Sequence, residues 1–306
     1  MGGGGGGYFP SRPKTLHDLI QGARESVEQQ RLNSEINKLM QDILTTLNER
    51  DTDRIKGCLE KIRGILSERV EMEQFLFGGS VAKHTYVDGL SDVDALAILS
   101  ETELADKSPR TILNVFHKLL KDKLTADEIK SVDKGKLAVT VTYQDKTEIQ
   151  LLPALRIGSK VLISDAWGNK WKETNPKIFQ RALTRANERL NCSLVPAIKL
   201  AKSIISGFPK QKRITGYHIE ALSLEAMKGY RGIKTVQALL KQIFSYSSNR
   251  VKRPINDVTG QSRVVDSYLG KSNSIERRIV ADAIAGVSRK LNTANSVDQW
   301  KTILED

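Results

Sequence analysis

The chain has 306 residues, enough for one large or two modest domains, and its 39% of hydrophobic residues can build a buried core. No apolar run approaches the roughly 20 residues needed to span a bilayer. The glycine tract at residues 2–7 lacks the parts of a signal peptide and the Ser or Thr of a myristoylation signal. Cys58 and Cys192 lack a CxxC or CxxH neighbour, which argues against zinc and disulfides. We expect a cytoplasmic protein with a flexible tail at residues 1–13 and both thiols buried in helices.

The chain is basic, because Lys and Arg exceed Asp and Glu by 48 − 36 = 12 residues. Such a field attracts polyanions, whether nucleoside triphosphates, nucleic acid or acidic membranes, although a basic balance also serves solubility alone. There is no zinc ribbon, no aromatic-rich sheet signature and no arginine-rich helix. The sequence therefore gives no support to activation by nucleic acid.

Two helices are predicted at the start of the folded region. Apolar residues recur at three- and four-residue steps from Leu16 to Leu47, which predicts one long helical region. A second helix is expected after the start signal at residues 51–53, with an apolar face through Leu66.

The hydrophobic period then changes to that of strands. Residues 74–77 predict a short apolar strand, and residues 93–99 are nearly all apolar, which predicts a strand buried on both faces. Ser108-Pro109 is a favourable helix start. The next predicted elements are a strand at residues 137–143, a turn at Asp145-Lys146, a returning strand at 147–152 that ends at Pro153, and a short strand at 160–163.

The second half of the chain has a helical pattern. Helices are expected near residues 176–189, 191–206, 216–229, 234–246, 273–291 and 296–304, with a loop at 249–262. The predicted architecture is α+β with two lobes. Residues 14–170 would form a mixed-sheet core with N-terminal helices, and residues 171–306 a helical C-terminal domain.

A glycine-rich turn follows the first predicted strand. Because glycine has no Cβ, backbone amides at Gly79 can approach a ligand closely. Ser80 then opens a predicted helix, where its hydroxyl and the helix N-terminus can bind a phosphate oxygen.

Two carboxylates stand at the head of the second predicted strand. Asp92 and Asp94 are two positions apart, so their side chains point to one face and can bridge two Mg²⁺ ions about 3.5–4 Å apart. One ion would bind the triphosphate, and the other would lower the pKa of an attacking hydroxyl. A Gly-Gly-Ser turn or an Asp-x-Asp pair alone is common on protein surfaces. In combination, two acids that head an apolar strand need a cation.

These motifs resemble a known superfamily. Gly79-Ser80 and the block 91–94 look like the active-site signature of DNA-polymerase-β-like nucleotidyltransferases. The block 148–154, Glu-Ile-Gln-Leu-Leu-Pro-Ala, resembles the third-carboxylate strand of oligoadenylate synthetases, and the block 215–222 resembles a helix of their C-terminal domain. The chain is most similar to the bacterial cGAS/DncV-like nucleotidyltransferases (CD-NTases), which make cyclic di- or trinucleotide signals in anti-phage defence. The resemblance covers roughly residues 35 to 300.

Two positions depart from the family pattern. The family often has glycine where His84 stands, and we interpret His84 as structural. Gln150 occupies the position of the third Asp, and an amide offers a carbonyl oxygen but no charge. Glu148 lies on the same strand face, about 6.6 Å away along the strand. Our hypothesis is that Glu148 is the third metal ligand; the alternative is an ion pair with a lysine and no catalytic role.

The resemblance also assigns substrate-binding residues. A lysine of the helix at residues 194–205 binds the β- and γ-phosphates in relatives, which points to Lys199 and Lys202. Tyr217 matches the family position whose ring stacks on a nucleobase. The alternatives are a solvated helix face for the two lysines and a core-capping role for Tyr217.

The function implied by the resemblance is template-independent synthesis of a cyclic oligonucleotide from ATP and other NTPs, with two Mg²⁺ or Mn²⁺ ions. A monomer is expected, whose product acts on a separate effector. The alternatives are linear oligoadenylate synthesis, nucleotidyl transfer to tRNA or protein, and a degenerate nucleotide-binding sensor. Gln150 favours the sensor, whereas the intact pair of Asp92 and Asp94 argues against it.

Overall fold

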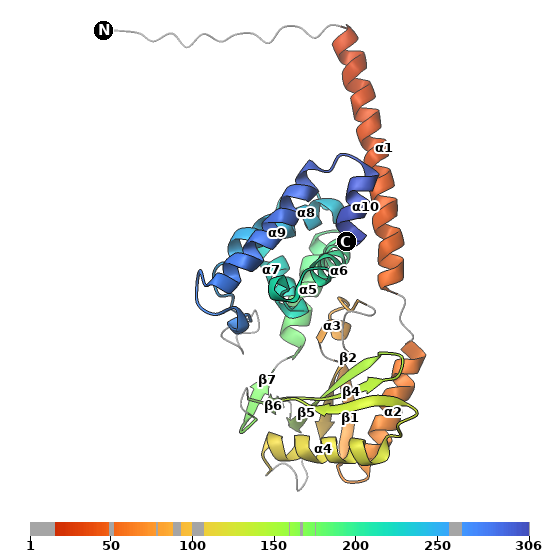
Figure 1. Cartoon of the computed structure of the whole chain (residues 1–306), viewed down its shortest axis with the longest axis vertical. Helices are drawn as coiled ribbons and strands as arrows, with labels where there is room; N and C mark the ends of the chain where they lie inside the picture. Colours follow the sequence, from red (N-terminus) through yellow and green to blue (C-terminus); the bar gives the residue numbers. More distant parts are fainter. Residues whose placement is uncertain are drawn as a thin grey trace, which may run out of the picture.

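The structure is a computed structural model that describes residues 16–48, 52–77, 79–87, 93–99, 107–158, 160–165, 168–174, 176–256 and 265–305. Its described parts form a sheet lobe and a helical lobe, which confirms the α+β class (Figure 1). The sheet lobe combines seven strands with helices α2 (Thr52–Ser67) and α4 (Pro109–Lys123). The helical lobe contains α5 to α10, and the short helix α3 (Gly79–Ala82) lies where the two lobes meet.

The sheet is mixed, in the order β1-β2-β5-β4-β3, and β6 pairs with both β5 and β7. Its strands are β1 (Met72–Phe77), β2 (Val93–Leu99), β3 (Ile129–Lys134), β4 (Val139–Tyr143), β5 (Glu148–Ile157), β6 (Lys160–Ser164) and β7 (Trp171–Thr174). The central pair, β2 and β5, is parallel, whereas β1 is antiparallel to β2 and β4 is antiparallel to β5.

The two faces of the central strands differ. On one face, Val93, Ala95, Ile149 and Leu151 are buried and pack in a core with α2 and α4. Helix α4 begins after the N-cap Ser108, whose side chain accepts a hydrogen bond from the Thr111 amide. The opposite face is half-buried and polar where β2 and β5 begin, and it becomes apolar further along both strands. A polar patch is therefore held at one end of a rigid sheet.

Strand β5 is longer than the sequence predicts. It continues through Pro153 to Ile157, so the prediction that it ends at Pro153 is wrong. The pairing with β4 reaches only Leu151, and the pairing with β6 begins at Ala154. Pro153 thus lies between the two partners on that side, where its missing N–H costs no ladder hydrogen bond.

Two strands were missed by sequence analysis. Both lie at sheet edges, where solvent weakens the alternation of apolar and polar residues: β3 carries exposed charged residues, and β7 has four residues. The other predicted strands and the hairpin turn are confirmed. Lys146 adopts a left-handed backbone there, and the Tyr143 amide donates to the Thr147 carbonyl oxygen.

The helical lobe has its own apolar core. It comprises α5 (Pro176–Arg189), α6 (Leu194–Ser206), α7 (Gly216–Ala226), α8 (Val236–Arg250), α9 (Ile275–Thr293) and α10 (Val297–Glu305). These agree with the predicted helices within a few residues. Cys58 lies half-buried in α2, but Cys192 is exposed in a left-handed turn after α5, so the prediction that it is buried in a helix is wrong.

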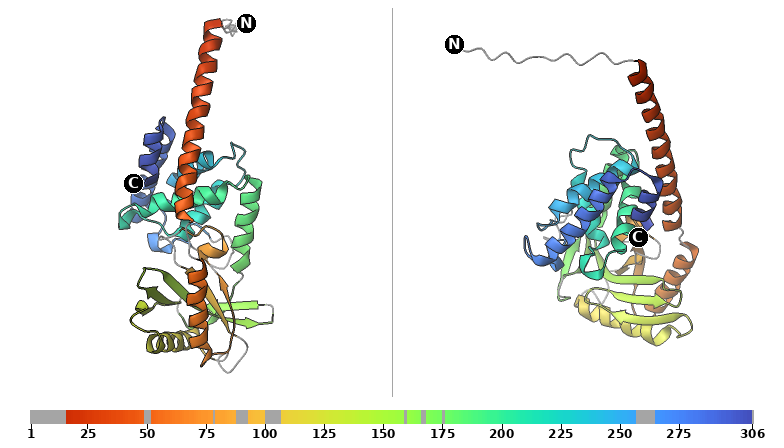
Figure 2. Two further views of the ribbon diagram at one scale, coloured as in Figure 1. Left: turned by 90° about the vertical axis from the view of Figure 1, so that its right-hand side faces the viewer. Right: turned by 45° about the horizontal axis from the view of Figure 1, so that its top comes forward.

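The first helix, α1 (Leu16–Leu47), joins the helical lobe although it precedes the sheet in sequence. Ile36 and Met40 are buried in the helical core, and α1 contacts α6 and α10. Residues 24–31 are exposed, and Figure 2 shows this part of α1 rising clear of the body. The division of the chain at residue 170 stays a prediction. None of the helices in the described ranges is long and apolar enough to cross a membrane.

Candidate active site

The predicted carboxylate strand faces the strand that carries Glu148 and Gln150. Asp94 and Gln150 are direct register partners of the parallel pair, so their side chains lie on the same half-buried face. Glu148 shares that face, and the Thr142 hydroxyl lies 3.5 Å from its Oε1 as a hydrogen-bond donor. Asp92 lies outside the described residues. Three of the polar side chains predicted to hold metal or nucleotide therefore meet at one end of the sheet.

The Gly-Ser turn is placed against this patch. Helix α3 begins at Gly79 and packs against β2. Ser80 is buried, and its carbonyl oxygen accepts a 2.9 Å hydrogen bond from the Thr85 amide, which closes the turn after α3. The turn is thereby held beside the strand that carries Asp94.

A buried cluster of four polar side chains joins the two lobes, and we call it the interlobe bridge: Lys83, Thr85, Lys202 and Glu220. Glu220 is 1% exposed and forms ion pairs with Lys83 and with Lys202, the second at 2.7 Å. The Thr85 hydroxyl donates to Glu220. Lys202 Nζ donates to the carbonyl oxygen of Thr85 at 2.8 Å and to its hydroxyl at 3.3 Å. The residues after α3 are thus fixed to helices α6 and α7.

Charge in the interlobe bridge acts on Asp94. Burial raises the pKa of Asp94, and Lys83 and Lys202 oppose that rise while Glu220 adds to it. Burial also lowers the pKa of Lys202. For Glu220, burial favours the neutral form, but the two lysines outweigh it and lower the pKa. Asp94 therefore lies in a partly dehydrated setting in which the charges of the interlobe bridge influence its pKa.

The block 215–222 contains four residues whose types the structure accounts for. Thr215 is the N-cap of α7, where its hydroxyl accepts a hydrogen bond from the His218 amide. A Cβ at Gly216 would come within 3.2 Å of Lys202 Cε, so glycine leaves room for the lysine arm on its way to Glu220. Tyr217 and Glu220 then face the interlobe bridge.

Tyr217 belongs to an aromatic pair with a cation over both rings. Its ring centroid lies 5.0 Å from that of Phe179, a buried residue of α5. Lys83 Nζ lies 4.7 Å from each of the two centroids. Such contacts are attractive because the ring faces carry negative potential. The predicted base platform is therefore built from α5, α7 and the turn that follows α3.

The two predicted phosphate-binding lysines differ in their surroundings. Lys202 is buried in the interlobe bridge, and its three N–H donors match its three contacts with Glu220 and Thr85. Lys199 is half-buried one turn earlier on α6, and it donates to the side chain of Asn48 at the end of α1. Their assignment to phosphate stays a prediction.

The backbone at His84 accounts for the family preference for glycine there. His84 has a φ of 59°, in the left-handed region that glycine adopts without steric cost. Its side chain is exposed. The position is thus a turn between the bridge residues Lys83 and Thr85, which supports the structural interpretation of His84.

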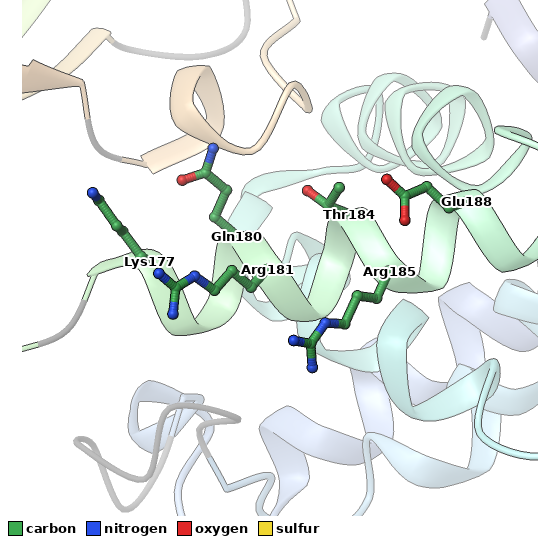
Figure 3. Close-up of a pocket in the computed structure, with 6 residues that line it drawn as sticks. All are labelled: Lys177, Gln180, Arg181, Thr184, Arg185 and Glu188. Atoms are coloured by element: carbon green, nitrogen blue, oxygen red, sulfur yellow. The ribbon is translucent and has the colours of Figure 1, made fainter.

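A surface pocket of about 370 Å³ lies apart from these residues (Figure 3). Its lining comes from the outer face of α5: Lys177, Gln180, Arg181, Thr184, Arg185 and Glu188. None of the predicted site residues lines it. The inner face of the same helix carries Phe179 toward Tyr217, so α5 separates this pocket from the interlobe bridge.

The comparison with protein families decides the classification. Residues 31–187, 157 of the 306 residues, match the family described as Second Messenger Oligonucleotide or Dinucleotide Synthetase domain, SMODS. The chain belongs to the SMODS family. It is thus a member of a family of CD-NTase nucleotidyltransferases named for the synthesis of second-messenger nucleotides, and the predicted resemblance is confirmed.

Solved structures share the SMODS chain's fold at low sequence identity. CdnC from E. coli MS115-1 with ATP has a TM-score of 0.62 at 17% identity, covering 83% of this chain and 90% of that one. CdnG from Bradyrhizobium diazoefficiens with GTP gives 0.61 at 13%, covering 83% and 88%. Vibrio cholerae DncV with the linear intermediate 5′-pppA(3′,5′)pG gives 0.61 at 11%, covering 95% and 90%. No curated protein matches the sequence.

Sequence analysis missed four residues around this SMODS site: Lys83, Thr85, Phe179 and Glu220. Glu220 carried a usable signal, because it stands in the apolar run Ile219-Glu220-Ala221-Leu222, where a charge needs a partner. Its partner Lys83 is 137 positions away in sequence, and nothing in the pattern links the two.

Proposed function

We propose that this SMODS chain is a template-independent nucleotidyltransferase that makes a cyclic di- or trinucleotide second messenger from NTPs for anti-phage signalling. The observation that carries the proposal is the shared position of Asp94, Gln150 and Glu148 at one end of the sheet, beside two buried lysines. A triphosphate is an anion that cations stabilise. Metal ions held by the carboxylate patch would lie on one side of it, and the lysines of the interlobe bridge on the other.

The donor set fits a divalent cation. Mg²⁺ prefers a few carboxylate oxygens combined with phosphate oxygens, and Asp94, Glu148 and the Gln150 carbonyl supply oxygen atoms alone. Asp94 is half-buried, so its carboxylate is poorly compensated by water. Among the described residues there is no group of three or more His, Cys, Asp or Glu side chains suited to a metal, and Asp92, the proposed partner ligand, lies outside them.

Each proposed residue has one task. Asp92, Asp94 and Glu148 hold two Mg²⁺ or Mn²⁺ ions, which when bound lower the pKa of the attacking ribose hydroxyl and neutralise the leaving pyrophosphate. Gly79 and Ser80 contact phosphate oxygens from the turn at α3. Lys199 donates to the triphosphate, and Lys202, whose N–H groups are taken by Glu220 and Thr85, contributes its charge. Tyr217 stacks on a base, and Gln150 contacts the nucleotide as a neutral ligand.

The reaction repeats one kind of transfer, twice for a cyclic dinucleotide and three times for a cyclic trinucleotide. The hydroxyl oxygen of one nucleotide attacks the α-phosphorus of another, the bond between the α-phosphorus and its bridging oxygen breaks, and pyrophosphate leaves while the hydroxyl proton passes to solvent. The linear product then turns so that its own free hydroxyl closes the ring in the same way. The linear intermediate bound to DncV supports this order for a chain of the same fold.

The test is a product assay with all four labelled NTPs and either Mg²⁺ or Mn²⁺. After phosphatase treatment we expect a resistant product whose mass gives the ring size and bases. A phosphatase-sensitive linear polymer would replace the proposal with linear synthesis. No product under either metal would favour the nucleotide-binding sensor, which is consistent with Gln150 in place of an acid.

Substitutions assign the ligands within the same assay. Asp94→Asn should abolish turnover, and Glu148→Gln should reduce it at least 100-fold because a metal ligand loses its charge. Asp133→Asn on the exposed edge strand β3 is the matched control and should leave turnover unchanged. If Glu148→Gln retains full activity while Asp94→Asn has none, Glu148 is not the third ligand.

A further inference from the structure

Lys83 has contacts that none of the proposed catalytic steps uses. It leaves the end of α3, is 9% exposed, and lies over the rings of Phe179 and Tyr217 while it is paired with Glu220. A lysine ammonium is strongly hydrated, so its burial needs compensation from every side. Here one carboxylate and two ring faces supply it, on helices α7 and α5.

We propose that Lys83 is a positioning residue of the nucleotide site, held in place by Glu220, that fixes the Tyr217 ring for base stacking. The inference rests on the proposed function, in which Tyr217 is the base platform. Lys83 lies over one face of the Tyr217 ring. The ring of Phe179 packs against that ring with an angle of 42° between the two ring planes. The proposal places the base on the other face of the ring, whose orientation is set before the nucleotide arrives.

The position of Lys83 also connects the base platform to the phosphate end of the site. Lys83 follows Ser80 by three residues, and its positive charge opposes the rise that burial causes in the pKa of Asp94. Glu220 joins Lys83 to Lys202 and, through the Thr85 hydroxyl, to the end of the turn. The orientation of the base and the position of the phosphates therefore depend on one cluster rather than on two independent ones.

Lys83→Met tests the role of the ammonium alone. Methionine is unbranched and of similar length, so it fills the space between the two rings without the charge. Glu220 keeps its 2.7 Å ion pair with Lys202 and its bond from Thr85, so the variant is expected to fold. We expect the KM for NTP to rise about tenfold with kcat changed less than threefold. The Kd for ATP with a non-reactive α,β-methylene bridge, measured by calorimetry, should rise equally.

A matched control exists in the helical lobe. Lys241 of α8 lies 5.3 Å from the ring centroid of Trp300 on α10, a cation–π pair remote from the proposed site. Lys241→Met removes the same kind of contact and should lower the Tm slightly while both KM and Kd stay at the wild-type value.

The double variant Lys83→Met/Tyr217→Ala decides how Lys83 acts. If Lys83 works through the ring, the effect of Lys83→Met on the Kd disappears once Tyr217 is alanine, so the double variant binds no worse than Tyr217→Ala alone. If the two substitutions raise the Kd by the product of their single effects, Lys83 contacts the nucleotide itself. If Lys83→Met lowers the Tm but leaves the Kd unchanged, its ion pair is purely structural. Either result overturns the proposal.

Failure of the proposed function gives a different pattern. The Kd measurement requires no turnover, so an inactive wild-type chain that binds the ATP analogue with the predicted coupling would overturn nucleotide synthesis while supporting the role of Lys83. An unchanged Kd in Tyr217→Ala would show that the base stacks elsewhere and would overturn the inference.

Discussion

Helix α7 supplies a carboxylate to one buried polar cluster and an imidazole to another. The two clusters differ in their burial and in their distance from the carboxylate patch of the sheet. Glu220 belongs to the interlobe bridge, whereas His218, two residues earlier, belongs to a second cluster with Asp266, Tyr268 and Arg277. We call this second set the lobe anchor. The bridge joins the sheet lobe to the helical lobe, and the lobe anchor lies within the helical lobe alone.

The centre of the lobe anchor is fully buried and rich in hydrogen bonds, although Tyr268 at its edge is 47% exposed and His218 Nε2 has no hydrogen-bond partner among the described residues. His218, Asp266 and Arg277 are each 0% exposed. Arg277 donates to Asp266 Oδ2 at 2.6 Å and to the carbonyl oxygens of Val251 and Gly270. A planar guanidinium with five donors is suited to such a junction, and Nε, Nη1 and Nη2 of Arg277 all donate to oxygen atoms of the protein.

The interlobe bridge differs because it borders the carboxylate patch. Its lysines keep 8–9% of their surface exposed, and its charges influence Asp94. The comparison teaches that burial of charge alone does not identify a functional cluster. We propose that proximity to the polar end of the sheet is the feature that does, and each prediction below tests that distinction.

The largest effect on stability is expected in the lobe anchor. Arg277→Met leaves the Asp266 carboxylate buried without its cation, which should lower the free energy of unfolding by about 3–5 kcal/mol in urea denaturation. The KM for NTP of the folded fraction should not change. A KM increase of tenfold would mean that the lobe anchor reaches the nucleotide site.

The lobe anchor should also make stability depend on pH. Burial lowers the pKa of His218 to about 4, against 6.5 in an unfolded chain. Between these values the unfolded state binds more protons, so the free energy of unfolding should fall by about 3 kcal/mol as the pH drops from 6.5 to 4. In His218→Gln this part of the slope should vanish when the two proteins are compared across the same pH range; equal slopes would contradict the assignment.

In the interlobe bridge, Glu220→Gln should affect both stability and substrate binding. Two lysines lose the charge of their shared counterion but keep an amide oxygen as hydrogen-bond acceptor, so we expect a loss of roughly 2 kcal/mol in the free energy of unfolding. The KM for NTP should rise with it, unlike in Arg277→Met. If Glu220→Gln lowers the stability but leaves the KM unchanged, the interlobe bridge has a structural role alone, like the lobe anchor.

The smallest expected effect is a gain. His84→Gly relieves a left-handed backbone beside the bridge and should raise the free energy of unfolding by about 0.5–1 kcal/mol, with no change in turnover. Asn191→Gly, at a φ of 55° in the helical lobe, is the matched control and should give a similar or smaller gain. Loss of turnover in His84→Gly alone would give the His84 side chain a role in the site.

Most of the fold was predictable because its signals are local. The apolar run of β2, the Ser108 cap of α4 and the helical periods of the second half each depend on neighbours in sequence. The misses follow from long-range context: Pro153 is tolerated because two other strands leave a gap beside it, and β3 and β7 lie at sheet edges.

The candidate site also has parts that local sequence predicts and parts that depend on long-range contacts. The sequence by itself predicted Asp94 and the Gly-Ser turn, because strand parity and backbone chemistry are properties of short segments. Gln150 was predicted through the family resemblance, and strand parity then placed Glu148 on the same face. Only the tertiary structure showed that the N–H donors of Lys202 bind Glu220 and Thr85 and that Lys83 lies over the rings of Phe179 and Tyr217. The physical reason is that ion pairs and ring contacts depend on distance in space, whereas Lys83 and Glu220 are 137 positions apart along the chain and Thr85 and Lys202 are 117 apart.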